Sequence, residues 1–445
     1  MTGSVMRTVL ILVASVLSLT GIASAQALSR ADAVAQALAS NPTVKLSQEQ
    51  IALLEGRIVE AKADALPDIT WNTLAMRSRD PGLLNSPNFD AFPQEFRDAL
   101  RPLPGNAFST TADIRQTLFS LKLGKALEAA RVARTSGDQD TQRARQLTAL
   151  DAIRAYNQLL FSMEQLRVIQ TNVQSKQTHV DYARNRRAAG VATELEVLRA
   201  EVDLENARAE ALRAENEVSG ARALLNTVML RPTSAPVVPT DSLAVVPFAA
   251  EFDAAVTEAL TARPELQLLR TQERVQGLLI DVTAADSKPS VEFTGAYGFA
   301  VRRPRNLFDP DFSSWSAAIN LKVPLFDGRR TAGRVAQSLA QRNTTTHQIA
   351  ALENQVRLEV QSAFDALALA DRTIQASELN VVQARRASEM TEANYKLGAA
   401  TQLDVVDAQQ SLRQAENIRN QAMYMHANAR ATLRFVMGRN PLETN

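Results

Sequence analysis

The chain has 445 residues, of which 22% are charged and 45% are hydrophobic, and its formal net charge is +1. So balanced a charge argues against a nucleic-acid partner, because such partners require a basic surface. The sequence contains no cysteine, which excludes disulfide bonds and a lipid-modified cysteine.

The N-terminal segment, residues 1–25, has the pattern of a cleaved secretory signal peptide. Arg7 precedes an apolar run over 9–19, and small residues end at Ala25, so the mature chain is expected to begin at Gln26. An uncleaved anchor helix is the alternative, but the run is shorter than the ~20 apolar residues that span a bilayer. No later stretch has 18 consecutive apolar residues. A membrane role would therefore require strands rather than helices.

The mature chain contains two copies of one unit. The stretch 190–207 recurs 208 positions later, and the stretch 33–67 recurs 222 positions later. The difference between these offsets places additional residues of the first copy in the Pro-rich segment 79–107, which is predicted to be a loop. The predicted organisation is a signal peptide (1–25), repeat 1 (26–230), a Pro-rich connector without helical or strand period (231–250), repeat 2 (251–438) and a C-terminal tail (439–445).

Both repeats are predicted to contain long, coiled-coil-like helices. Apolar residues step by threes and fours from Leu147 to Val173 and form one narrow stripe. Gly190 and Gly398 are expected at the turns, where a helix end favours a positive φ. The long helices and their return helices are predicted at 120–187, 194–230, 328–395 and 402–438.

The lengths of these helices imply further packing partners. A helix of some 68 residues would be about 100 Å long, and its return helix would cover only about half of it. Single helices at 28–66 and 251–287 are expected to line the remainder.

Segments between the helices alternate apolar and polar side chains, as membrane strands with a wet lumen do. Repeat 1 shows this pattern weakly, with Ile69 and Trp71 in one strand and Ala112, Ile114 and Leu118 in the other. The alternative is a soluble hairpin that is half-buried on the helices. The residues predicted to face lipid are Val291, Phe293, Tyr297, Phe299, Trp315, Ile319, Leu321 and Val323.

Four strands per chain cannot close a membrane sheet, because an open strand edge does not persist in lipid. The chain is therefore expected to oligomerise. A dimer would supply eight strands and a trimer twelve, and the strand pattern alone does not choose between them.

The sequence shows no catalytic or phosphate-binding motif. His179, His347 and His426 lie in separate predicted helices, and each is expected to be a surface residue rather than a metal ligand. We therefore expect no enzymatic activity, no cofactor and no metal site.

Acidic residues follow the second predicted turn. Asp404 and Asp407 are three positions apart, which places both on one helix face just after Gly398. In an oligomeric tube they would form rings of carboxylates that bind cations and raise one another's pKa. The alternative is an ordinary helix start, where the macrodipole favours acids. The corresponding positions of repeat 1 hold Glu196 and Arg199.

These features together resemble the TolC-like outer membrane efflux and type I secretion channels. The resemblance covers the mature chain and rests on the duplicated helix, strand, loop, strand and helix unit, on Ala37, Leu38, Asn41 and Pro42, and on YKLGAATQLDVVDAQ at 395–409. It implies a mainly α-helical fold with membrane β-strands, in which a homotrimer forms a twelve-stranded β-barrel continued by a twelve-helix periplasmic α-barrel. It also implies a periplasmic adaptor and an inner-membrane transporter as partners.

The resemblance assigns the family's gate to the periplasmic tip. Tyr395 matches the gate tyrosine, and Asp404 and Asp407 match the two constriction aspartates. Glu196 falls where the acidic partner from the first copy would be. Ala400 replaces the gate arginine, so the family's ion pair is in doubt. The arginines that could substitute are Arg186, Arg187 and Arg199.

The sequence therefore predicts a passive outer-membrane conduit that extends into the periplasm. Loops 79–107 and 302–312 are expected outside the cell, and turns 188–193 and 396–401 at the far periplasmic end, because about 100 Å of helix separates the two sets. A soluble periplasmic coiled-coil adaptor or scaffold is the alternative, but such proteins typically carry one helical hairpin with β-rich flanking domains. Neither the transported substrate nor the transporter class can be read from the sequence.

Overall fold

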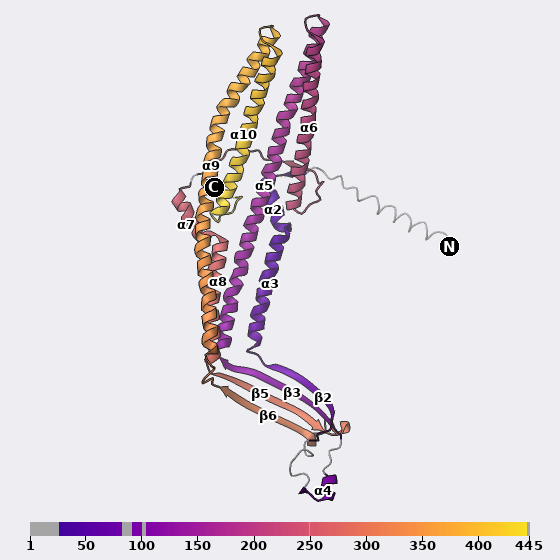
Figure 1. Cartoon of the computed structure of the whole chain (residues 1–445), viewed down its shortest axis with the longest axis vertical. Helices are drawn as coiled ribbons and strands as arrows, with labels where there is room; N and C mark the ends of the chain where they lie inside the picture. Colours follow the sequence, from indigo (N-terminus) through magenta and orange to yellow (C-terminus); the bar gives the residue numbers. More distant parts are fainter. Residues whose placement is uncertain (1–25, 82–90, 100–103, 249, 443–445) are drawn as a thin grey trace, which may run out of the picture. The chain divides into compact units, whose positions relative to one another are not determined.

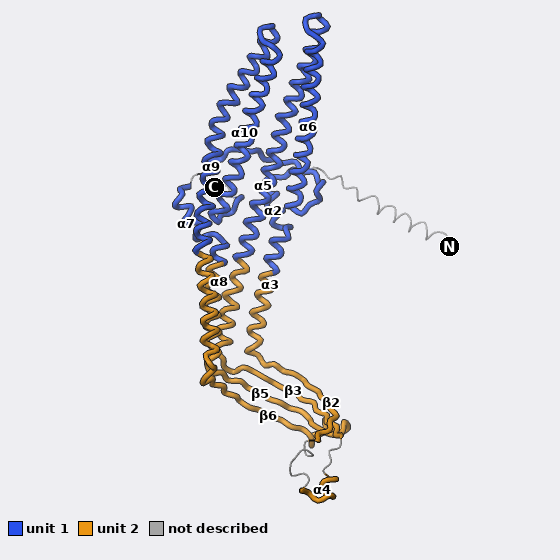
Figure 2. The backbone as a smooth tube through the Cα atoms, viewed as in Figure 1, with its two compact units in different colours: residues 1–49, 139–268, 350–445 blue, residues 50–138, 269–349 orange. Residues whose placement is uncertain are grey.

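The structure is a computed structural model that describes residues 26–81, 91–99, 104–248 and 250–442. The predicted signal peptide and part of the predicted loop 79–107 lie outside the described residues. The chain forms two compact units, which Figure 2 shows in different colours. Unit 1 consists of 1–49, 139–268 and 350–445, and unit 2 of 50–138 and 269–349.

The order of elements is the same in both repeats (Figure 1). Repeat 1 contains α2 (Arg30–Ser40), α3 (Pro42–Ala63), β2 (Asp68–Ser78), α4 (Gln94–Ala99), β3 (Gly105–Ser120), α5 (Leu121–Ala188) and α6 (Glu194–Val228). Repeat 2 contains α7 (Phe252–Ala262), α8 (Pro264–Ala284), η3 (Ala285–Ser287), β5 (Ser290–Val301), η4 (Pro304–Asn306), η5 (Pro310–Phe312), β6 (Ser313–Lys322), α9 (Arg330–Lys396) and α10 (Gln402–Val436). The four predicted long and return helices agree with these bounds to within two residues at each end.

The prediction of single helices at 28–66 and 251–287 is wrong. Each is broken in two, after Asn41 and after Arg263. Both residues precede a proline, and both have extended ψ values, 128° and 123°. The proline ring disfavours helical backbone in the residue before it but suits the first position of the next helix. The same break therefore occurs in both repeats.

Unit 1 contains a two-stranded parallel sheet that the sequence analysis missed. Within the predicted connector 231–250, β4 (Val237–Pro239) pairs with β1 (Gln26–Leu28). Tyr156 of α5 is fully buried and donates its hydroxyl to the Leu28 carbonyl at 2.8 Å. Strands of three residues are too short to show an alternation of apolar and polar side chains in the sequence. The pairing of β1 with β4 depends on the core that surrounds them.

That core of unit 1 has two apolar clusters. One joins α2, α5 and α6 and includes Val34, Leu159 and Leu225. The other joins α7, α9 and α10 and includes Val356 and Leu433. The positions at 33–37 and 255–259 that recur in the sequence are thus core positions in both repeats.

Unit 2 contains an antiparallel sheet with the strand order β2-β3-β5-β6. The register pairs Val291 with Leu321 and Phe293 with Ile319, so the apolar positions of adjacent strands share one face. A bulge between Thr117 and Phe119 shifts the register of β3 against β5. Among the described residues, no helix is long and apolar enough to span a membrane.

Candidate functional site

Each long helix ends in a turn at a glycine. Gly190 has a φ of +74° and Gly398 a φ of +77°. The amide of Gly190 bonds the Arg187 carbonyl at 2.9 Å and the amide of Val191 bonds the Arg186 carbonyl at 3.0 Å, and the second turn repeats both bonds. This helix-ending motif needs left-handed backbone, which glycine adopts without steric cost. The turns lie where the glycines predicted them.

The return helices begin at equivalent threonines. Thr193 Oγ1 accepts a hydrogen bond from the Glu196 amide at 3.3 Å, and Thr401 Oγ1 accepts one from the Asp404 amide at 3.2 Å. In the second turn the Asp404 carboxylate also accepts from the Thr401 amide at 2.7 Å. The side-chain hydrogen bond with Thr401 is the main cause that lowers the pKa of Asp404. Asp404 is therefore half of a capping box, as at an ordinary helix start.

The other predicted acidic and basic positions are less engaged. Asp407 is exposed one helical turn after Asp404. Its counterpart Arg199 is exposed and Glu196 is half-buried. Within one chain, Asp407 is thus the carboxylate of the predicted pair that remains outside the cap.

A compact group of side chains joins the two repeats near these turns. We call it the tip cluster, and it consists of His179, Tyr182 and Arg186 of α5 and Tyr395 of α9. Tyr395 is 7% exposed, and Arg186 Nη1 donates to its hydroxyl at 3.3 Å. The Arg186 guanidinium lies 5.6 Å from the Tyr395 ring centroid and 5.9 Å from that of Tyr182. The two tyrosine rings meet edge to face at 5.4 Å.

The cluster combines hydrogen bonding with cation–π attraction, and burial strengthens both. The hydrogen bond to Tyr395 raises the pKa of Arg186. His179 packs against Tyr395 at 5.6 Å, and burial lowers its pKa. The cluster can therefore hold the end of α9 against α5 with a cation that does not titrate.

The structure distinguishes the arginines that could replace the one missing at Ala400. Arg186 is the one that contacts Tyr395. Arg187 instead pairs with Glu194 of the same hairpin at 3.2 Å, and Arg199 is exposed.

A polar contact region lies further along these helices, and sequence reasoning missed it. Gln409 of α10 donates to Ser175 of α5 and Glu392 of α9, each at 2.9 Å. Arg413 of α10 pairs with Glu210 of α6 at 2.9 Å. A pocket of about 400 Å³ lies beside Gln409 and is lined by charged side chains of three helices. Sequence spacing gave no signal for the contacts of Gln409 with Ser175 and of Arg413 with Glu210, because they connect helices of different repeats.

The histidine prediction is wrong in part. His347 is exposed as expected, but His426 is 1% exposed. It belongs to the buried stripe of α10 that includes Ala422 and Ala429. Its Nε2 lies 3.2 Å from Asp371 Oδ1, and burial lowers its pKa. Among the described residues, no group of three or more His, Cys, Asp or Glu side chains is placed to hold a metal ion.

The residues predicted to face lipid lie on the sheet. Trp315, Ile319 and Leu321 are 78%, 70% and 66% exposed. Tyr297 is 53% exposed and pairs with Trp315, on the face that also carries Val291, Phe293 and Phe299. Val323 follows directly after β6 and is 48% exposed. Apolar side chains thus lie along one face of the sheet, and the core clusters of the described residues contain none of them.

Comparisons with known proteins agree with this architecture. A model of the outer membrane efflux protein family matches residues 33–229 and 255–439, one match in each repeat. Outer membrane protein OprJ of Pseudomonas aeruginosa is 24% identical over 400 residues, which cover 85% of this chain and 77% of OprJ. Outer membrane protein TolC of Vibrio cholerae is 22% identical over 375 residues, 82% of this chain and 84% of that protein.

A solved structure has the same fold. The outer membrane protein VceC from Vibrio cholerae superposes with a TM-score of 0.76 at 17% identity, over 92% of this chain and 96% of that chain. The matched proteins do not support the alternative of a soluble periplasmic adaptor.

Proposed function

We propose a specific role within the outer membrane efflux protein family, to which this chain belongs because the family model matches most of both repeats. The chain is an outer membrane efflux or secretion channel. In our proposal it is the passive exit duct of a tripartite efflux or type I secretion system. A periplasmic adaptor would join it to an inner-membrane transporter, and a gate at the hairpin tips would close it at rest.

Exposed apolar side chains on α9 support the assembly of several copies of the chain into a closed ring. Phe161 of α5 stacks on Tyr424 of α10 at 4.9 Å. Leu369, its counterpart 208 positions later on α9, is 57% exposed. Likewise Leu150 is 3% exposed and its counterpart Leu358 is 59% exposed. A neighbouring copy that placed its α6 against α9 would repeat the α5–α10 contact of one chain.

Such a contact joins unlike surfaces of two copies, and rings of identical copies close in this way. Three copies would supply twelve strands and twelve long or return helices. The barrel would remove the free strand edges, which cannot persist in lipid. The exposed apolar face with Trp315 and Ile319 would then meet the outer membrane, with segment 302–312 outside the cell and the turns at Gly190 and Gly398 in the periplasm.

The observation that carries the gate proposal is the contact between half-buried Arg186 and buried Tyr395. It joins α5 of repeat 1 to α9 of repeat 2, so α9 cannot move away from α5 at the tip without breaking it. Arg186 thereby takes the role of the arginine that Ala400 replaces. Opening would require the loss of one charge-assisted hydrogen bond, of the cation–π contact between Arg186 and the Tyr395 ring, and of the ring contact between Tyr182 and Tyr395.

Single-channel conductance in planar bilayers tests this proposal. We expect Arg186→Ala to raise the resting conductance, and Tyr395→Phe to raise it less because the ring contact remains. Arg184→Ala is the matched control, since Arg184 pairs with Glu201 at 2.7 Å within the first hairpin. Equal conductance in all three variants would refute the gate. The proposed duct itself would be refuted if the purified protein formed no pores and the protein in cells were absent from the outer-membrane fraction.

A further inference from the structure

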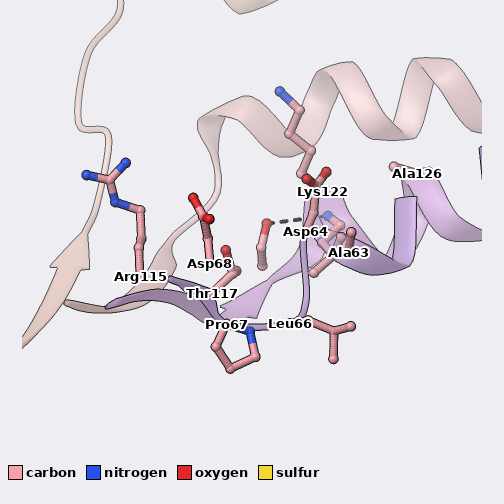
Figure 3. Close-up of a pocket in the computed structure, with 11 residues that line it drawn as sticks. Ala63, Asp64, Leu66, Pro67, Asp68, Arg115, Thr117, Lys122 and Ala126 are labelled. Carbon is pink, nitrogen blue, oxygen red and sulfur yellow. Dashed lines mark hydrogen bonds between the residues drawn. The ribbon is translucent and has the colours of Figure 1, made fainter. Parts of the chain in front are cut away.

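A pocket lies beside the free edge of the sheet. Its volume is about 640 Å³, and it is formed by the end of α3, the start of β2 and the start of α5 (Figure 3). Asp64 and Asp68 line it together with Lys122 and Arg115. Strand β2 lies at one edge of the sheet and β6 at the other, so the pocket adjoins a strand that is paired on one side only.

The junction between the two repeats shows what occupies the equivalent place inside one chain. Asp286, which corresponds to Asp64 at the offset of 222, accepts from Lys122 Nζ at 2.7 Å and pairs with Arg334 at 3.3 Å. The hydrogen bond from Lys122 is the main cause that lowers the pKa of Asp286. Asp64 itself is exposed, and no ion pair of Asp64 occurs among the described residues.

Repeat 2 has cations where repeat 1 has Lys122. The offset between the repeats is 207 in the second strands and 208 in the long helices. The residue that corresponds to Lys122 is therefore Arg329 by the strand offset and Arg330 by the helix offset. Both arginines are exposed at the start of α9, next to the free strand β6. Neither has an ion-pair partner within the described part of the chain. One acid and two cations are therefore left over at opposite edges of the sheet.

The apolar residues beside these charges show the same correspondence. Phe119 pairs with Val291 where β3 meets β5. Their counterparts are Phe326 and Ile69, at offsets of 207 and 222. Phe326 is 86% exposed and Ile69 is 69% exposed. Phe119 and Val291 are thus opposite each other at the junction between the repeats, where Phe119 is still 57% exposed, whereas Phe326 and Ile69 lie at the two edges of the sheet and are more exposed.

We infer that the pocket at Asp64 binds Arg329 and Arg330 of a neighbouring copy of this chain and is the socket for these side chains. Strand β6 of that copy then pairs with β2 in the register that β3 keeps with β5 within one chain. This inference rests on the proposed ring of copies. It adds the strand register and the ion pair. Within one chain, Ile114 of β3 lies opposite Gly295 of β5. The equivalent pair between two copies is Leu321 of β6 and Thr73 of β2. The Asp68 carboxylate, which lines the same pocket, faces the incoming guanidinium groups.

Disulfide trapping tests the register, because the natural chain has no cysteine. Directly opposed residues of antiparallel strands have Cα atoms about 4.5–5.5 Å apart, within the span that a disulfide requires. We expect Thr73→Cys with Leu321→Cys to give covalently linked dimers and trimers on mild oxidation of the purified protein. Thr73→Cys with Ala317→Cys is the matched control, since four residues along a strand add about 13 Å.

A charge exchange tests the ion pair. We expect Asp64→Arg, and separately Arg329→Asp with Arg330→Asp, to lose the oligomer band in detergent gels at temperatures where the parent protein retains it. The three substitutions combined should restore the band. Failure of the combination to restore it would refute the socket, whatever the effect of the single changes.

Two further outcomes separate this inference from the proposed function. The first is that the control pair cross-links more strongly than the test pair, or that neither pair cross-links, in a protein that still forms conducting oligomers. Either result would overturn the register and leave the proposed duct intact. A protein that remains monomeric and forms no pores would overturn both.

Discussion

The two hairpin tips have the same backbone and different side chains. Both turns place a glycine at positive φ, and both return helices begin at a threonine cap. The first tip, however, carries Arg186 and Arg187 where the second carries Asn394 and Tyr395. The copies thus share the residues that build the turn and differ in those that meet across it. The contact of Arg186 with Tyr395 joins two positions at which the copies differ.

The difference extends to the first turn of each return helix. At the second tip, Asp404 completes a capping box with Thr401, whereas at the first tip Thr193 caps the helix and Arg187 pairs with Glu194. The first tip is therefore held by an ion pair across its own turn, and the second by hydrogen bonds within one helix start. Local stability at the two tips should respond differently to the same perturbation.

The largest expected effect breaks what the tips share. Gly190→Val and Gly398→Val each place a β-branched residue in left-handed backbone, which costs about 1–3 kcal/mol. We expect amide hydrogen exchange to accelerate about five- to a hundredfold at the altered tip and to stay unchanged at the other. Exchange at peptides spanning 186–196 and 394–404 measures both. Unchanged exchange in either variant would mean that the glycine is not required by the turn.

A smaller effect separates the two caps. Removing a threonine cap costs about 1 kcal/mol. Thr401→Ala should accelerate exchange at its tip more than Thr193→Ala does at the first, because the Asp404 carboxylate also loses the hydrogen bond that the Thr401 hydroxyl donates to it. The serine variants at both positions serve as controls, since serine caps equally well. Equal acceleration at both tips would argue that the bond from the Thr401 hydroxyl to Asp404 contributes nothing.

The acid response of the second tip follows from Asp404. Its pKa in the folded chain is lowered below the ordinary value of 3.8 by its bonds to Thr401. A carboxyl whose folded pKa is lowered stabilises the fold above its ordinary value, and that contribution is lost as the pH falls through the lowered value. We therefore expect exchange at 394–404 to rise below about pH 4 relative to Asp404→Asn, which lacks this titration. Parallel acid profiles for the two proteins would contradict this account.

The smallest expected effect concerns cations. If copies form a narrow ring at the second tip, Asp407 presents exposed carboxylates there, and these should favour cations and bind multivalent ones. Asp407→Ala should weaken cation selectivity and polyvalent-cation block in planar bilayers, and the double variant with Asp404→Ala should weaken them little further. Arg199→Ala, at the equivalent position of repeat 1, is the control. Selectivity and block that persist without both aspartates would show that neither lines the pore.

The sequence predicted features that depend on local chemistry. The long helices, their glycine turns and the alternating strands follow from periodicity and from the few residues that tolerate a turn. It failed where the outcome depends on partners distant in the chain. His426 shares a helical stripe with Ala422 and Ala429, but which stripe of α10 is buried depends on the helices packed against it. Arg186 was one of three arginines that could meet Tyr395. The helix breaks at Asn41 and Arg263 were readable from the prolines that follow them, and the long-helix interpretation overlooked them.

Strand β1 has a consequence for the order in which the chain folds. Its residues pair with 237–239, and the Arg30 amide bonds Asp241, 211 residues away. Residues 26–28 can therefore make these contacts only after both helices of the first hairpin and the connector have been synthesised. Loop closure over that length costs conformational entropy, which the buried Tyr156 and Leu28 must outweigh. Folding of unit 1 is thus completed late, when residues 26–28 meet partners more than 200 positions further along the chain.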